Sequence, residues 1–212
     1  MHCYRNHRRG NRRKIAALKK GGARVAVTGC LAERKDSAAA EILKLADIVV
    51  PNSGKFKPEN YGLKPAADTA LLLRGFSGRD KAFVKIEEGC DNFCAYCEVP
   101  YVRGGSVRSR PEEEVLLEIR MLVSYGFKEI VLTGINLGYY GKDRRSASAL
   151  TGLLKRAVEL PGDFRIRLSS IGPRETDRAM IELMASRPER ICPHLHMSLQ
   201  SGDDDILKSM GR

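Results

Sequence analysis

The sequence predicts an α/β protein in two parts, a small α/β domain followed by a larger domain built like part of a β/α barrel. Two observations support this class: apolar strand-like segments alternate with amphipathic helical segments, and polar or Gly residues follow the strands. Such alternation is typical of parallel strands joined by right-handed crossovers. We expect the domains at residues 1–54 and 81–212, with a linker at 55–80 that contains several Pro and Gly residues.

The first domain reads as helix, strand, helix and strand with short connections. Residues 14–20 predict a basic helix that stops at Gly21-Gly22, and residues 24–30 predict a short buried strand ending in a Gly turn. Apolar residues at helical spacing predict a helix over 36–46, and 47–50 predict a second strand. This order favours a small layered α/β structure.

In the second domain, predicted strands and helices alternate more regularly. The helix expected over 111–125 has Pro111 at its start, three Glu residues in its first turn and Gly126 as its stop. Two further helices are expected near 146–159 and 174–186. Strands are expected near 82–87, 129–133, 164–169 and 194–199.

The charge is unevenly distributed along the chain. The formal net charge is +11, yet residues 1–35 hold eleven Lys or Arg and one acid, Glu33, so the excess is a basic N-terminal arm. Such an arm is either a solvated tail or a phosphate-binding segment. No apolar run is long enough for a membrane helix and no secretory signal is evident, so we expect a cytoplasmic protein that does not associate with a membrane.

Three cysteines form the most informative motif. Cys90, Cys94 and Cys97 follow a predicted strand with C-x3-C-x2-C spacing, and no fourth Cys or His lies nearby. Three thiolates suit a [4Fe–4S] cluster whose fourth iron is left open for a ligand. A structural zinc site needs four ligands, and the remaining candidates, His194 and His196, lie about a hundred residues downstream. A disulfide framework fits poorly in a chain of this size with no secretory signal.

Polar clusters follow the later strands as well. They occupy 133–138, 169–173 and 200–203. Loops at the carboxyl ends of barrel strands converge over one face, so we expect these clusters to surround a cavity facing the Cys triplet.

The motif resembles that of the radical S-adenosylmethionine (SAM) methylthiotransferases. The match is carried by Cys90-x3-Cys94-x-Tyr96-Cys97 with Pro100-Tyr101-x-Arg103-Gly104 after it, and by Arg108-Ser109-Arg110-Pro111. Further matches are Val27-Thr28-Gly29-Cys30, Leu132-Thr133-Gly134-Ile135-Asn136-Leu137-Gly138 and Leu199-Gln200-Ser201-Gly202. Within that family, Arg165-Ile166-Arg167-Leu168-Ser169-Ser170-Ile171 and the loop at 132–138 are most similar to the branch that methylthiolates N6-threonylcarbamoyladenosine beside the tRNA anticodon.

The resemblance implies cofactors and site residues. Cys90, Cys94 and Cys97 would hold the SAM-binding [4Fe–4S] cluster, and an auxiliary [4Fe–4S] cluster would use Cys30 and Cys3. Residues implied to contact SAM or substrate are Tyr96, Gly134, Asn136, Ser169 and Gln200. Arg103, Arg108 and Arg110 face either phosphate or solvent, and Cys192 reads as a strand-edge thiol.

The function implied is transfer of a methylthio group to tRNA, with an external electron donor as a second partner. Residues 1–13 do not follow the family pattern, and both domains are expected to be partial, so the chain is expected to be a fragment, truncated at both ends, that need not be active alone. The alternatives are a methylthiotransferase for another tRNA adenosine or for a ribosomal protein, and a non-catalytic zinc or RNA-binding protein.

Overall fold

Short parallel strands flanked by helices build both parts of the chain. The computed structural model describes residues 2–55, 57–64, 80–144 and 149–212, with side chains from Gly10 onward. The chain divides into two compact units, Met1–Ala70 and Leu71–Arg212. Residues 65–79, most of the predicted linker, lie outside the described part.

The first unit is a two-stranded parallel sheet with helices. Its elements are α1 (His2–Lys20), β1 (Ala26–Thr28), α2 (Cys30–Glu33), α3 (Ser37–Leu43), β2 (Ile48–Val50), η1 (Asn52–Gly54) and η2 (Pro58–Tyr61). Strand β1 pairs with β2 from Ala26↔Ile48 to Thr28↔Val50. Its small core is formed by Ile15, Val25 and Ile42.

Two aspartates fix the local geometry of this unit. Asp36 caps α3, because its Oδ1 accepts hydrogen bonds from the amides of Ala38 and Ala39 at 3.1 and 3.0 Å. Asp47 accepts from the Val25 amide at 2.8 Å, and its other oxygen lies 2.9 Å from the Lys19 ammonium. These contacts tie α1 and the start of β1 to the residue that precedes β2.

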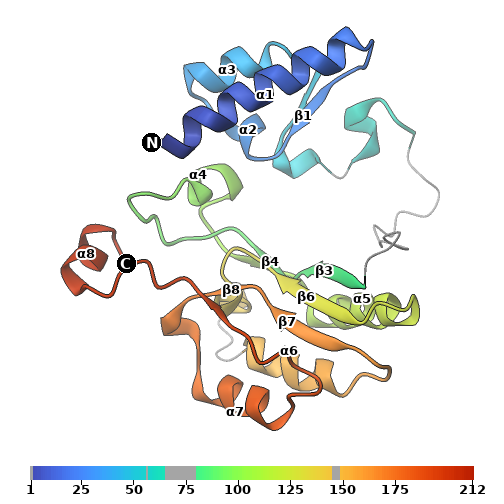
Figure 1. The fold of residues 1–212 in the computed structure, drawn as a ribbon, viewed down its shortest axis with the longest axis vertical. Helices are drawn as coiled ribbons and strands as arrows, with labels where there is room; N and C mark the ends of the chain where they lie inside the picture. Colours follow the sequence, from blue (N-terminus) through green and yellow to red (C-terminus); the bar gives the residue numbers. More distant parts are fainter. Residues whose placement is uncertain (1, 56, 65–79, 145–148) are drawn as a thin grey trace. The chain divides into compact units, whose positions relative to one another are not determined.

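The second unit is organised around a three-stranded parallel sheet in the order β3-β6-β7 (Figure 1). The strands are β3 (Lys81–Lys85), β6 (Glu129–Thr133) and β7 (Arg165–Leu168), with register Lys81↔Glu129 and Leu132↔Leu168. Two small two-stranded sheets lie beside it: antiparallel β4 (Glu87–Glu88) with β5 (Arg108–Ser109), and parallel β8 (Ser170–Ile171) with β9 (His196–Met197). The expected α/β class with parallel strands in a partial barrel is confirmed.

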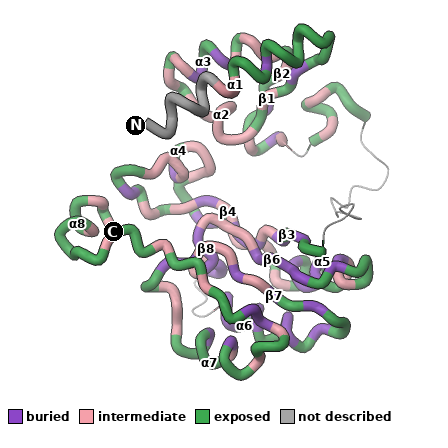
Figure 2. Tube along the Cα trace, viewed as in Figure 1, coloured by how far each residue is buried: buried purple, intermediate pink, exposed green. Residues whose placement is uncertain are grey.

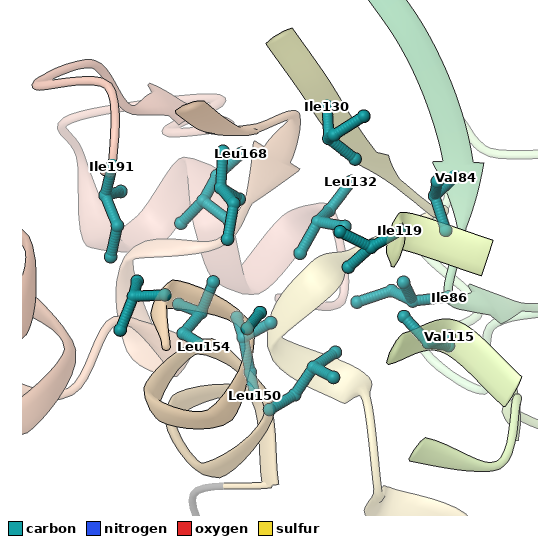
Figure 3. Close-up of a cluster of buried hydrophobic side chains, with 14 of the residues drawn as sticks. Val84, Ile86, Val115, Ile119, Ile130, Leu132, Leu150, Leu154, Leu168 and Ile191 are labelled. Carbon is teal, nitrogen blue, oxygen red and sulfur yellow. The ribbon is translucent and has the colours of Figure 1, made fainter. Parts of the chain in front are cut away.

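Helices cover one face of this sheet. They are α5 (Glu112–Ser124), α6 (Ala149–Val158) and α7 (Arg178–Ser186); α4 (Val99–Arg103), α8 (Asp204–Ser209), η3 (Leu137–Tyr139), η4 (Lys142–Arg144) and η5 (Pro173–Glu175) complete the unit. Side chains of alternate strand residues such as Val84, Leu132 and Leu168 pack against Ile119 and Leu154 of the helices (Figure 3). Figure 2 shows that burial concentrates in this sheet and its helices, whereas α8 is largely exposed.

Several predicted elements differ from the structure. The basic helix expected over 14–20 extends back to His2, and the helix expected over 174–186 starts at Arg178, where Asp177 caps it by accepting from the Met180 amide at 2.6 Å. The strand expected over 194–199 is only two residues long and pairs with β8, not β7.

The reason for that short strand lies at Pro193. The chain runs beside β7 at Ile191, and the Cys192 amide donates to the Ile166 carbonyl at 2.8 Å. Proline has no N–H to continue such a ladder, and pairing resumes only at His196, opposite Ser170.

No helix in the described part of the chain combines the length and apolarity needed to span a membrane.

Candidate functional site

Cys90, Cys94 and Cys97 line one cavity of about 200 Å³, here called the thiol cavity. It lies at the carboxyl ends of the parallel strands, where the loops after β4, β6 and β8 meet the segment after β9. Besides the three cysteines, its walls are formed by Asn92, Tyr96, Val99, Ile135, Asn136, Tyr139, Ser170, Ile171, Gly172, Ser198, Gln200 and Arg212.

The Cys loop is held by backbone contacts. The amide of Cys90 donates to the Gly104 carbonyl at 3.3 Å, and the amide of Ala95 donates to the Met210 carbonyl at 2.9 Å. Gly89 has φ 87°, and a Cβ there would lie 2.0 Å from the Ser106 carbonyl oxygen. Only glycine therefore fits directly before the first cysteine.

The thiols sit in a partly desolvated setting. Cys94 is buried, whereas Cys90 and Cys97 are half-buried. The side-chain amide of Asn92 donates to the Cys94 sulfur at 3.3 Å. Burial is the main cause that raises the pKa of Cys90, and the neighbouring thiols and Asp91 add to the rise. Neighbouring thiolates repel one another unless a cation is shared among them.

This donor set fits an iron–sulfur cluster. Among residues 2–55, 57–64, 80–144 and 149–212, no three Cys, His, Asp or Glu side chains converge on a single metal ion position. A [4Fe–4S] cluster instead takes each thiolate on a different iron, which suits thiols spread around a cavity wall. Neither His194 nor His196 lines the cavity; the His196 ring lies 3.3 Å from the Ser170 hydroxyl.

Asn136 joins two of the cavity loops. Its Oδ1 accepts from the amides of Gly138 and Gly172 at 3.2 and 3.1 Å, and its Nδ2 donates to Glu175 at 3.2 Å. The side chain is buried and all its polar atoms are engaged. Asn136 therefore fixes the loop after β6 against the loop after β8.

Glu87, which the sequence analysis did not identify, supports the same loop from behind. Its side chain is 1% exposed, and Oε1 accepts from the Asn136 amide at 2.8 Å, whereas Oε2 is buried with no hydrogen-bond partner among the described residues. Burial raises the pKa of Glu87 to about 7, against the lowering effect of the amides of Asn136 and Ile135. A buried carboxyl in a strand that pairs with a polar strand gives no recognisable sequence pattern.

Gly134 and Ser169 lie beside the cavity without lining it. A Cβ at Gly134 would be 2.0 Å from Glu87 Oε1, so this glycine permits close packing of the loop on Glu87. The Ser169 hydroxyl is buried with no hydrogen-bond partner in the described part. Their neighbours Ile135 and Ser170 line the cavity instead.

Tyr96 and Gln200 line the thiol cavity, as does Asn136. The Tyr96 ring is about half exposed, and Gln200 has φ 67°, a left-handed backbone that is costly for a residue with a side chain.

Tyr139 and Arg212 also line the cavity, although sequence reasoning did not select them. Burial, followed by the negative charge of Glu175, raises the pKa of Tyr139 to about 12, so its hydroxyl stays a neutral donor. Arg212 donates to the Ser198 carbonyl at 3.0 Å.

The three arginines near the Cys loop have internal partners. Arg103 pairs with Glu88 at 3.0 Å, and Arg110 pairs with Glu118. Arg108 donates to the Arg103 carbonyl at 2.9 Å. Internal pairing favours a structural role for Arg103 and Arg110 over contact with phosphate.

The remaining cysteines lie elsewhere. Cys30 is the first residue of α2, directly after Gly29 with its φ of 85°, and Cys3 lies on α1 with its side chain outside the described part. Cys192 is buried with its sulfur 4.0 Å from Glu129.

Comparison with known proteins agrees with this site. Residues 84–212 match the family model of the Radical SAM superfamily. The threonylcarbamoyladenosine tRNA methylthiotransferase MtaB of Thermotoga maritima is 39% identical over 202 residues, covering 90% of this chain and 45% of that protein. The tRNA-2-methylthio-N(6)-dimethylallyladenosine synthase of Carboxydothermus hydrogenoformans is 45% identical over 132 residues, covering 62% of this chain and 30% of that protein.

A solved structure shows a weaker likeness. The radical S-adenosylmethionine methyltransferase TsrM of Kitasatospora setae superimposes with a TM-score of 0.49 and 17% identity, covering 60% of this chain and 23% of that one. This chain spans less than half the length of the curated relatives it matches. Since the family model covers more than half of the chain and includes the three cavity thiols, the chain belongs to the radical SAM superfamily, and its sequence relatives include tRNA methylthiotransferases.

Proposed function

We propose that this chain carries the catalytic core of a methylthiotransferase that adds a methylthio group to N6-threonylcarbamoyladenosine beside the tRNA anticodon. The observation that carries the proposal is the set of three thiols on one cavity wall, at the carboxyl ends of parallel strands. The family match favours this function over a non-catalytic zinc or RNA-binding protein.

The residues that line the thiol cavity have different proposed roles. Cys90, Cys94 and Cys97, which line the cavity, would hold the cluster, and the ring of Tyr96 would pack against the adenine of SAM. When bound, a [4Fe–4S] cluster with SAM supplies one-electron cleavage of the sulfonium bond. Asn136 and Gln200 line the cavity where SAM or the substrate would bind.

Gly134 and Ser169 support this site indirectly. Gly134 lets the loop after β6 lie close to Glu87, and Ser169 precedes the cavity-lining Ser170. Such support keeps the target carbon within reach of the reacting group.

Three further parts of the proposal rest on the sequence resemblance. An auxiliary [4Fe–4S] cluster would use Cys30 and Cys3 in the first unit. An external donor would supply the electron. Because the substrate is tRNA, the protein would act in the cytoplasm.

The choice of nucleoside has two candidates. The Thermotoga relative, matched over nine-tenths of this chain, is named for threonylcarbamoyladenosine. The second candidate is N6-dimethylallyladenosine, for which the Carboxydothermus relative is named. That relative has a higher sequence identity to this chain, but over a shorter stretch.

The test is an anaerobic assay of the full natural protein with its clusters reconstituted. It is offered tRNA carrying either N6-threonylcarbamoyladenosine or N6-dimethylallyladenosine, and the digested nucleosides are analysed by mass spectrometry. The proposal expects a methylthio product from the first tRNA. If only the dimethylallyl tRNA gives a methylthio product, the substrate is the second candidate nucleoside. If neither tRNA gives a product, the proposed function is refuted.

A further inference from the structure

A second cavity of about 160 Å³ adjoins the thiol cavity and is here called the side cavity. The two share the wall residues Asn92, Tyr139, Ser198 and Arg212. A substrate with its reacting carbon in the thiol cavity can therefore place a substituent of the same base in the side cavity.

The side cavity has a mixed lining, in which Pro173, Leu199 and Leu207 are apolar and the charged side chains are positive in excess. Arg174, Arg212 and Glu175 all line it. The Glu175 carboxylate accepts from Asn136 at 3.2 Å, and Arg212 donates to the Ser198 carbonyl. Arg174, by contrast, has no hydrogen bond or ion pair within the described segments, and its side chain is exposed. Its planar guanidinium is thus available to a ligand and matches a carboxylate with two parallel hydrogen bonds.

The two candidate nucleosides differ in the charge and polarity of the N6 substituent that would enter the side cavity. A threonylcarbamoyl group ends in a carboxylate and a hydroxyl, whereas a dimethylallyl group is a branched hydrocarbon. A hydrocarbon placed against guanidinium groups removes water from them and returns no hydrogen bond. A carboxylate replaces that water with charge-assisted hydrogen bonds.

We propose that Arg174 binds the carboxylate of the N6 substituent in the side cavity and so determines which modified adenosine is accepted. The inference rests on the proposed function, since it names the group by which that function selects its substrate. Arg212 is a poor diagnostic because it lines both cavities, whereas Arg174 lines the side cavity and not the thiol cavity.

The experiment measures binding without turnover. The full natural protein, with oxidised clusters and SAM, is titrated by calorimetry with the nucleoside N6-threonylcarbamoyladenosine and with its neutral methyl ester. A charge-assisted hydrogen bond corresponds to a roughly 10- to 100-fold preference for the acid over the ester. Arg174→Gln should bring this ratio close to one, and Arg174→Lys should retain part of it as a point charge.

Arg178→Gln is the matched control. Arg178 lies four residues away, its side chain is 92% exposed, and its partner is Glu182 on the same helix. This variant should keep the wild-type preference for the acid. The inference is overturned if wild type binds acid and ester equally, or if Arg174→Gln keeps the wild-type ratio.

The acid-to-ester binding ratio tests the role of Arg174, and the tRNA assay tests the proposed substrate, so either result can be negative without the other. An enzyme that prefers the acid through Arg174 yet methylthiolates only dimethylallyl tRNA would retain the carboxylate site and refute the proposed substrate. An enzyme that modifies threonylcarbamoyl tRNA but shows no acid preference would retain the function and refute the role of Arg174.

Discussion

The carboxyl group of Glu87 is buried beneath the loop after β6, with one oxygen bonded to the Asn136 amide and the other without a partner in the part of the chain that the structure describes. A carboxylate in this position would leave one charged oxygen unsolvated, whereas the protonated acid avoids that cost. Burial accordingly raises the pKa of Glu87 from its ordinary value of 4.5 to about 7.

This shift makes stability depend on pH. Because the folded state holds the proton more tightly, the contribution of Glu87 is present below pH 4.5 and is lost as the pH rises through about 7. Between pH 5 and pH 8 wild type should lose about 2–3 kcal/mol of unfolding free energy more than Glu87→Gln does. Denaturant unfolding at both pH values checks this.

Glu182→Gln is the control, since Glu182 is largely exposed on α7. It should retain the wild-type pH dependence. If Glu87→Gln also retains it, the Glu87 carboxyl is not the group responsible.

At the scale of elements, the site depends on how closely the loop after β6 packs. Glu87 on β4 supports this loop from one side, and Asn136 bonds it to the loop after β8 on the other. The close approach is possible because residue 134 has no side chain. The position of the loop is therefore set by packing between elements.

Gly134→Ala should disturb this packing. The new Cβ would meet Glu87 Oε1 at 2.0 Å and its Cδ at 2.7 Å, which forces the loop or the buried carboxyl to move. Overpacking of this kind costs about 1–3 kcal/mol of unfolding free energy. Thermal and denaturant unfolding would measure the loss.

Gly152→Ala is the matched control in helix α6. Among the described residues, no atom outside the adjoining helix backbone lies within 4 Å of the Cβ position at Gly152, and Ala is favoured over Gly in a helix by about 1 kcal/mol. It should therefore stabilise the protein. Equal effects of the two substitutions would contradict the packing argument.

At the scale of the whole molecule, the sequence predicted the elements that have strong local signals. Pro111 and three glutamates mark the start of helix α5 and Gly126 follows its end, and the helix lies within the predicted range of 111–125. Strand β6 has the bounds that the sequence predicted, 129–133. Helix α8 was not predicted, because it is six residues long and has Asp203 as its local signal. The interruption of strand pairing after Cys192 was not predicted, because it depends on which strands are neighbours in space.

The site was predictable to a similar degree. Cys spacing and polar strand ends pointed to the segments that line the thiol cavity, including Tyr96, Asn136 and Gln200. Ser169 was selected from the same segment, but its neighbour Ser170 lines the cavity instead. Glu87 contacts Asn136, 49 residues away in the chain, and Arg174 lines a cavity formed by segments distant in sequence, neither of which a single sequence reveals.

The central claim is that the thiols of one cavity hold a [4Fe–4S] cluster with an iron open to SAM. Its most direct test is iron and sulfide analysis with electron paramagnetic resonance of anaerobically reconstituted protein. Wild type and Cys192→Ala, which removes a buried thiol outside the cavity, should hold the same cluster, with a reduced signal that changes when SAM is added.

Cys94→Ala should lose about four irons with their sulfides and the response to SAM. Retention of both by Cys94→Ala, or a wild-type protein that binds zinc without sulfide, would contradict the claim.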